Sequence, residues 1–475
     1  MTDTVTSYEQ TPYVFYSFPE SQPRWLQSVA HLFGVETPAP AECRVLELGC
    51  AVGGNIVPMA YSLPRATLVG IDLVASQIET AKKFAAASGV QNLELRAANI
   101  MDVTPEWGKF DYVIAHGVFS WVPHEVAEKV LQICAEQLTP TGVAYISFNT
   151  YPGWHVRMWA LDAMRFHVDN SADPMQKARA GRDFILALGE APFTSALLRG
   201  EVKYLQGKAE SYVLHEYFES TNHPFYFRDF AARIARHGLQ YLGDALQNGL
   251  LAAESWAPFR SWMEANRNDV IRQEQYVDFV RNREFRRALI CHGSLTLDRT
   301  QMSARVATMH AAGFLRQSAA DNGMTRFEHA RGNLVIGAGP LHDALVRIIG
   351  RFPRALAVTE LIDAAGQHRA TLLRELLSCW LNGMLELYVD PPAVLAPPAS
   401  DKPRASLVAR YLAAQDQTPI NRRHGSIPVD ATQRRFIQLL DGTRTRDQLA
   451  TDMGMARENI DRLIQFSLNA ALLEP

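Results

Sequence analysis

Residues 43–54 read CRVLELGCAVGG, an apolar run that breaks into a glycine-rich turn. Val45, Leu46 and Leu48 have the character of a buried strand, and Gly49, Gly53 and Gly54 follow closely. Glycine lets the main chain turn tightly and approach a ligand with no Cβ in between. A helix beginning after this turn would direct its free N–H groups at the same ligand. The stretch therefore predicts a strand–loop–helix unit that holds a ligand.

The next apolar run, residues 66–72, ends on an acid, Asp72, which follows Gly49 by 23 residues. This is about the spacing at which a carboxylate meets ribose hydroxyls in dinucleotide-binding folds. The loop, however, has the form E-x-G-C-A-x-G-G instead of G-x-G-x-x-G, and Glu47 lies inside the strand end. These two features argue against an NAD site.

Strand and helix patterns alternate five times between residues 41 and 150, with further strand-like runs at 92–97, 110–116 and 142–149. Such alternation predicts right-handed crossovers and a parallel sheet, an α/β fold of the Rossmann-like kind. Ligands of these sheets bind beyond the carboxyl ends of the strands.

The form E-L-G-C-A-x-G-G-N resembles motif I of class I S-adenosylmethionine (SAM) methyltransferases, and Asp72 resembles their ribose-binding acid. Asn99-Ile100 is similar to the acid–apolar pair that frames adenine, except that the acid is here an amide. The resemblance implies SAM as the cofactor, the alternative being a Rossmann-like sheet that binds no nucleotide. It implies the following cofactor-binding residues: Glu47, Gly49, Ala51, Gly53, Asn55, Asp72, Asn99 and Ile100.

Longer strings, among them FDYVIAHGVFSWVP, GVAYISFNTYPGWH, YVLHEYFE and FVRNREFRRALICH, resemble bacterial methyltransferases that carry a methyltransferase regulatory domain. Members of that group include protein-lysine methyltransferases of outer-membrane proteins. The resemblance implies methyl transfer to a protein acceptor. A small-molecule O- or N-methyltransferase is the enzymatic alternative, and a SAM-sensing interaction protein is the alternative from another class.

The chain has 475 residues, 47% of them hydrophobic, which predicts several domains with sizeable cores. A formal charge of −3 gives no global field for nucleic acid or an anionic membrane. Five scattered cysteines without a C-x-x-C pair argue for a reducing compartment and against a disulfide scaffold or a metal site. With no signal peptide and no long apolar run, we expect a cytoplasmic protein without membrane insertion. Whether it forms a homo-oligomer stays open.

We expect five parts. Residues 1–40 hold an amphipathic helix and upstream aromatic residues, read either as a cover for the sheet edge or as a lid over the cofactor. Residues 41–150 form the SAM domain, and 151–325 a mostly helical substrate or regulatory domain. Residues 326–400 and 401–475 form tandem winged-helix-like modules. The aromatic residues of the expected lid are Tyr8, Tyr13, Phe15, Tyr16 and Phe18.

The tandem is predicted from a weak internal repeat. Leu373, Leu376, Leu377 and Leu381 recur as Ile460, Leu463, Ile464 and Leu468, at an offset of 87 residues. Such modules often bind DNA. Residues 401–475, however, carry eleven Lys or Arg against nine Asp or Glu, less basic than a groove reader. We therefore expect interaction or structural modules and no nucleic-acid partner.

Methyl and acceptor should meet at HGVFSW, residues 116–121, after the fourth strand. His116 is the candidate proton acceptor or orienting group, or a histidine that only shapes the pocket. Tyr151 and Trp154 leave the fifth strand at the same rim and are candidates for catalytic contacts or for packing. His215 and Glu216 are more speculative candidates.

Overall fold

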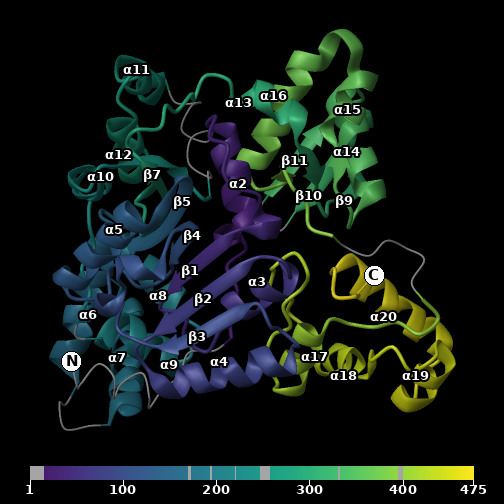
Figure 1. Ribbon diagram of the computed structural model, residues 1–475, viewed down its shortest axis with the longest axis horizontal. Helices are drawn as coiled ribbons and strands as arrows, with labels where there is room; N and C mark the ends of the chain where they lie inside the picture. The colour runs from purple at the N-terminus through teal and green to yellow at the C-terminus, as the bar shows by residue number, and fades with distance from the viewer. Residues whose placement is uncertain are drawn as a thin grey trace.

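The computed structural model describes residues 15–168, 173–192, 195–219, 221–246, 257–329, 332–393 and 400–474 (Figure 1). The expected lid residues Tyr8 and Tyr13 lie outside the described residues. Within the described ranges, no helix combines the length and the apolar character needed to cross a membrane.

A seven-stranded sheet in the order β3-β2-β1-β4-β5-β7-β6 organises the larger part of the chain. Its strands are β1 (Arg44–Leu48), β2 (Thr67–Asp72), β3 (Leu93–Ala97), β4 (Phe110–Ala115), β5 (Leu138–Asn149), β6 (Leu239–Asp244) and β7 (Phe285–His292). The first five are parallel, as predicted, and β7 runs antiparallel between β5 and β6. The strand order reverses between β1 and β4, so the loops after these two strands open on a common crevice.

Three helices connect the parallel strands: α3 (Ile56–Ser62), α4 (Ala75–Ala87) and α5 (His124–Gln137). Strands β1, β2 and β4 are mostly buried, and in β1 only Arg44 is exposed, whereas the edge strand β3 is largely accessible. This burial on both faces explains why the strands read as near-continuous apolar runs.

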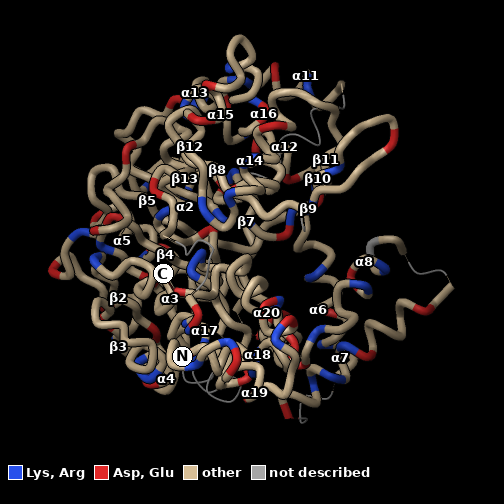
Figure 2. Tube along the Cα trace, turned by 90° about the vertical axis from the view of Figure 1, so that its right-hand side faces the viewer, with Lys and Arg blue, Asp and Glu red and all other residues tan. Residues whose placement is uncertain are grey.

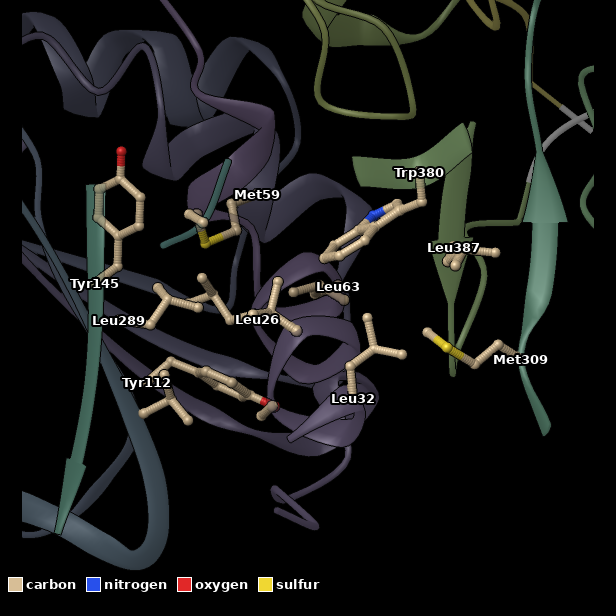
Figure 3. Close-up of a cluster of buried hydrophobic side chains, with 14 of the residues drawn as sticks. Leu26, Leu32, Met59, Leu63, Tyr112, Tyr145, Leu289, Met309, Trp380 and Leu387 are labelled. Atoms are coloured by element: carbon tan, nitrogen blue, oxygen red, sulfur yellow. The ribbon is translucent and has the colours of Figure 1, made fainter. Parts of the chain in front are cut away.

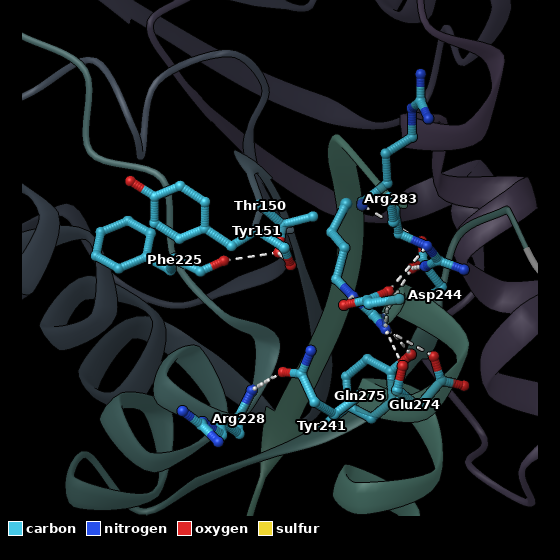
Figure 4. Close-up of polar contacts among 12 residues, drawn as sticks. Thr150, Tyr151, Phe225, Arg228, Tyr241, Asp244, Glu274, Gln275 and Arg283 are labelled. Atoms are coloured by element: carbon cyan, nitrogen blue, oxygen red, sulfur yellow. Dashed lines mark hydrogen bonds and ion pairs between the residues drawn. The ribbon is translucent and has the colours of Figure 1, made fainter. Parts of the chain in front are cut away.

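The range 151–325 is mostly helical, as predicted, but it also contributes β6 and β7, which complete the sheet. The segment RNREFRR is locally basic, yet Arg286 of β7 is fully buried. Its guanidinium donates to Asp278 Oδ2 at 2.9 Å and to Asp244 Oδ2 at 3.2 Å. Figure 4 shows Asp244 and Glu274 gathered in this polar cluster. Asp278 and Asp244 therefore neutralise the charge of Arg286 inside the strand.

The helical insert is shorter than predicted and forms a small subdomain between β5 and β6 in the chain. It has its own small apolar core. It contains α6 (Trp154–His167), α7 (Pro174–Gly189), α8 (Ala196–Leu205), α9 (Glu210–Val213) and the π-helical turn η5 (Leu214–Phe218). Beyond it, α10 (Phe227–Arg236) precedes β6, and α11 (Ala257–Ala265) and α12 (Val270–Arg281) precede β7.

The predicted N-terminal helix, α2 (Pro23–Leu32), is buried between the sheet and the first C-terminal module. Figure 3 shows Leu26 between Tyr145 and Leu289 on the sheet side and Trp380 on the module side. All these side chains belong to one apolar cluster that extends through both parts. The helix thus joins the two parts instead of only covering an edge.

Both C-terminal modules follow the same plan, as the repeat predicted. The first contains β8 (His310–Ala312), α14 (Pro340–Arg351), β12 (Leu356–Ala357), α15 (Val358–Ala365), α16 (Arg369–Leu381) and β13 (Glu386–Tyr388). The second contains α17 (Leu407–Ala414), α18 (Ala431–Leu439), α19 (Arg446–Met453) and α20 (Arg457–Asn469). In the first module, β8 pairs with β12 and β13. In the second module, isolated antiparallel β-bridges between backbone segments take the place of these strands, at Arg404 with Asp441 and at Ala405 with Leu473.

The predicted start of the first module, residue 326, is too late, because the central strand of its sheet, β8, lies at His310–Ala312. The short helix α13 (Met302–Arg305) lies upstream of β8. A separate three-stranded meander follows β8 and consists of β9 (Arg316–Ala319), β10 (Thr325–His329) and β11 (Gly332–Ile336).

Candidate functional site

The loop after β1 carries glycines at positions where the backbone conformation or the neighbouring residues leave no room for a side chain. Gly49 and Gly53 both have φ of 78°, a conformation that favours glycine. A Cβ on Gly49 would lie 2.6 Å from Val118 Cγ2, and one on Gly54 would lie 2.5 Å from the backbone nitrogen of Tyr16. Ala51 also has a positive φ, 47°. The predicted loop residues therefore form one tight turn, in which Gly53 and Gly54 are buried.

Glu47 is buried beneath this loop and has one unused oxygen. Its Oε1 accepts a hydrogen bond from Asn55 Nδ2 at 2.7 Å. Its Oε2 is buried and has no hydrogen-bond partner among the residues that the structure describes. Burial raises the pKa of Glu47 to about 7, with a smaller contribution from the charge of Asp72. A buried carboxylate oxygen of this kind fits a cationic group such as the ammonium of SAM.

Asp72 lies at the end of β2 and faces the same loop. Its two oxygens accept from the backbone N–H of Ala51 at 2.9 Å and of Val74 at 3.0 Å. Burial raises the pKa of Asp72, and these hydrogen bonds oppose that rise. A carboxylate has about four lone-pair sites, so two remain for ribose hydroxyls. The structure brings Asp72 and the glycine loop together, as the spacing predicted.

Asn99 and Ile100 follow β3 at the same edge of the sheet. The Oδ1 atom of Asn99 accepts from the backbone N–H of Met101 at 3.0 Å, which leaves the amide NH₂ as a donor. Two apolar side chains nearby in the sequence are unusually exposed: Leu73 at 47% and Met101 at 44%. Sequence reasoning missed them. Their place directly after the β2 acid and the β3 amide pair suits the two faces of an adenine ring.

The segment Phe15–Gln22 crosses the loop after β1; we name it the strap. The backbone N–H of Phe18 donates to Asn55 Oδ1 at 3.0 Å. The ring of Phe18 stacks on that of His116, with centroids 3.4 Å apart. Tyr16 is 55% exposed. Of the expected lid residues, Phe18 thus lies beside the residue that follows β4, whereas Phe15 packs against Phe84 of α4, with ring centroids 5.1 Å apart.

His116 follows β4 and forms the floor of this crevice. Its Nδ1 lies 2.8 Å from the hydroxyl of Tyr145, and its ring lies 5.8 Å from that of Phe285. Burial and the nearby charge of Arg287 hold the pKa of His116 well below its usual range. The ring is therefore neutral, and its weak basicity suits orientation better than capture of a proton from an ammonium.

Tyr151 and Trp154 occupy different environments. Tyr151 stacks on His155 with ring centroids 4.1 Å apart and remains partly exposed at the rim. Figure 4 shows it beside Thr150, whose hydroxyl donates to the carbonyl of Phe225 at 2.6 Å. Trp154 is only 1% exposed and packs edge-on against Trp121. This burial favours the packing interpretation for Trp154 over a direct catalytic contact.

His215 and Glu216 also lie away from the crevice. Glu216 accepts from Arg157 at 2.9 Å, and Arg157 also donates to Glu284 at 2.7 Å. His215 lies 3.3 Å from Glu219, and both are buried. Arg157 thus joins Glu216 of the insert to Glu284, directly before β7, and His215 lies beside Glu219 at the end of η5.

Comparison with known proteins agrees with this geometry. Three families match: "Methyltransferase domain" over residues 45–142, "Predicted methyltransferase regulatory domain" over 209–292, and "PKMT, C-terminal winged helix domain" over 401–466. The regulatory-domain match ends at the last residue of β7 and so contains both antiparallel strands.

Two relatives come from Rickettsia prowazekii. Protein RP789 is 37% identical over 298 residues, which are 62% of this chain and 54% of the relative. The chain thus spans about half the length of RP789. Protein RP028 is 35% identical over 242 residues, which are 50% of this chain and 96% of the relative.

The solved structure of PKMT2 from Rickettsia typhi in complex with AdoHcy covers 97% of this chain and 100% of that chain, with a TM-score of 0.84 and 26% identity. The likeness therefore includes the sheet, the insert and both modules. The chain belongs to the class I SAM-dependent methyltransferases that carry a methyltransferase regulatory domain and a C-terminal winged helix domain.

Proposed function

We propose that this chain transfers a methyl group from SAM to the side-chain amine of lysine in a protein acceptor, with outer-membrane proteins as the expected acceptor class. The likeness to PKMT2 supports this, because it extends over both C-terminal modules and the insert. These parts extend beyond the parallel sheet that carries the motif residues. An acceptor as large as a protein would need such additional surface for binding.

On the cofactor side, Glu47 would meet the ammonium, Asp72 the ribose, and Leu73 with Met101 the adenine. The cofactor supplies an electrophilic methyl group on a sulfonium, and the protein contributes mainly by positioning the acceptor in line with it.

The observation that carries the acceptor assignment is the environment of His116. A lysine amine must be neutral to accept a methyl group, and deprotonation at pH 7 costs about 4 to 5 kcal/mol from a pKa of about 10.4. Burial and the charge of Arg287 keep the imidazole of His116 neutral. The same two causes would lower the pKa of a lysine ammonium placed beside it. Tyr151 would then guide the acceptor at the rim.

Incubation of the purified protein with methyl-labelled SAM and an outer-membrane protein fraction tests the proposal. We expect label on lysine, located by mass spectrometry of tryptic peptides, and no label with Asp72→Ala. Label confined to small molecules would instead establish the small-molecule methyltransferase. SAM binding without label in any fraction would establish the SAM-sensing protein.

A further inference from the structure

A turn of the second C-terminal module reaches the cofactor loop from the far end of the sequence. His424 is 2% exposed, and its Nε2 lies 2.8 Å from Oδ1 of Asn55. The two residues are separated by 369 positions in the chain. Asn55 closes the E-L-G-C-A-x-G-G-N motif, so this contact joins the winged helix module to the loop that would hold SAM.

The turn is built to hold His424 in a fixed place. His424 has φ of 66°, which an L side chain adopts at a cost in strain. The side-chain oxygen of Asn421 accepts from the backbone N–H of Arg423 at 3.0 Å and of Gly425 at 2.8 Å. The guanidinium of Arg423 donates to the carbonyl of Pro353 in the first module at 2.7 Å. Both modules therefore determine where the imidazole lies.

The contacts of Asn55 fix which way its amide points. Its Oδ1 accepts from the backbone N–H of Phe18, so this atom is the oxygen and His424 Nε2 must donate to it. Its Nδ2 then donates to Glu47 Oε1 at 2.7 Å and to Ser21 Oγ at 3.0 Å. Burial lowers the pKa of His424 to about 3, so a single N–H on Nε2 is consistent with the neutral ring.

With Oε1 of Glu47 engaged by Asn55, only Oε2 is left for a ligand. We propose that His424 is a positioning residue for the cofactor: it fixes the amide of Asn55, which in turn directs the free oxygen of Glu47 toward the ammonium of SAM. The winged helix module is then part of the SAM site. This inference rests on the proposed function only through the binding of SAM.

A second set of contacts makes the same connection through the strap. The hydroxyl of Ser17 lies 3.2 Å from that of Ser426, two residues beyond His424. Phe15 packs edge-on against Tyr411 of α17, with centroids 6.4 Å apart. The module thus contacts the glycine loop and its cover together, and displacement of the module would disturb both.

A matched pair of substitutions tests the role of the donor. Gln and Met have nearly the same shape, but only Gln can donate to Asn55. In calorimetric titrations of the full chain with S-adenosylhomocysteine, we expect His424→Met to weaken affinity about tenfold and His424→Gln to stay within about threefold of wild type. In methylation assays, the KM for SAM should rise with His424→Met while kcat changes by less than about threefold.

Two controls separate positioning from simple packing. Ile464→Val, in the core of the same module, should lower the melting temperature slightly and leave affinity unchanged. In a Glu47→Gln background, His424→Met should add little further loss, because both changes act on one hydrogen-bonded chain.

Wild-type affinity in a folded His424→Met protein, equal losses in the Met and Gln variants, or additive losses with Glu47→Gln would each overturn the inference. A wild-type chain that bound no S-adenosylhomocysteine would overturn the methyltransferase function itself, and the inference with it.

Discussion

Asp72 connects the glycine loop to the segment that follows β2, since it accepts from the backbone N–H groups of Ala51 and Val74. We predict that Asp72→Ala weakens SAM binding by about 1.5 to 3 kcal/mol, the range for a lost charge-assisted hydrogen bond. Isothermal calorimetry measures this directly. Glu79→Gln, which removes an exposed acid paired with Lys82, is the control. Unchanged affinity in the Asp72 variant would remove this residue from the site.

Glu47 should make cofactor binding depend on pH. Its pKa is about 7 in the cofactor-free chain, and an adjacent ammonium favours the ionised carboxylate. Binding should therefore release a proton, and affinity should rise as pH increases from about 5.5 to 8. Titrations in buffers of different ionisation enthalpy count the protons released, and Glu47→Gln should release fewer. Equal proton release by both proteins would contradict this.

The stability of the cofactor-free chain should depend on pH in the opposite direction to cofactor affinity. A carboxyl whose pKa is raised from an ordinary value of 4.5 to about 7 binds more protons when folded. In the cofactor-free chain, the contribution of Glu47 to the free energy of unfolding therefore falls as pH rises through that window. Added SAM should reverse the trend.

Residues with a sequence motif were the ones that could be predicted. Glu47, Asp72 and the glycines lie where their spacing placed them, because the motif and the strand ends are local features. His424 could not be predicted, since its partner Asn55 is 369 residues away and only the folded chain brings them together. Trp154 lies near the rim in sequence, but its side chain turns into the core.

Among the strands, β7 depends on a buried charge cluster. Arg286 is fully buried with Asp278 and Asp244, so its removal leaves uncompensated carboxylates. We predict that Arg286→Met lowers the free energy of unfolding by about 3 to 5 kcal/mol. Denaturant unfolding measures the loss. Arg267→Met, which breaks the exposed pair with Glu264, should change stability by less than about 1 kcal/mol. Similar losses in the two variants would contradict the role of the cluster.

The segment that leaves β5 should separate acceptor handling from cofactor binding. Tyr151 is partly exposed at the rim, so Tyr151→Ala should depress methyl transfer tenfold or more, about 1.4 kcal/mol in barrier, while SAM affinity changes less than a few-fold. Trp154→Ala should instead lower stability by about 3 to 5 kcal/mol, because it empties a buried site. Parallel loss of SAM binding and turnover in Tyr151→Ala would place this residue in the cofactor site.

Helices and strands with a regular pattern of apolar residues were predicted, and strands without such a pattern were not. The parallel strands and α2 have clear apolar patterns. The antiparallel strands β6 and β7 were missed because a helical insert separates them from β5 and because β7 begins with charged residues. Only long-range pairing with acids of α12 and β6 makes such a strand stable.

In the whole molecule, the sheet, α2, the first module and Val408 and Leu412 of α17 share one continuous apolar core, and the second module also has a core of its own. The second module nevertheless contacts the cofactor loop through His424 and the strap through Ser426. The second module is thus packed against the catalytic domain.

The second module should therefore not bind DNA. Figure 2 shows basic and acidic positions interspersed along α18, α19 and α20. Two arginines of α19 and α20 are held in ion pairs: Arg446 contacts Asp461 at 3.0 Å, and Arg457 contacts both Asp461 and Asp447. Binding to phosphates would have to break these pairs, and the near-zero net charge releases few counterions in return.

We predict that the full chain shows no sub-micromolar affinity for duplex DNA at physiological salt, measured by fluorescence anisotropy. Asp447→Asn with Asp461→Asn frees both arginines and should increase non-specific binding at low salt, which ties the prediction to charge pairing and not to the helix shape. Tight wild-type binding with a steep salt dependence would contradict it, because such a slope requires several unpaired cations on one face.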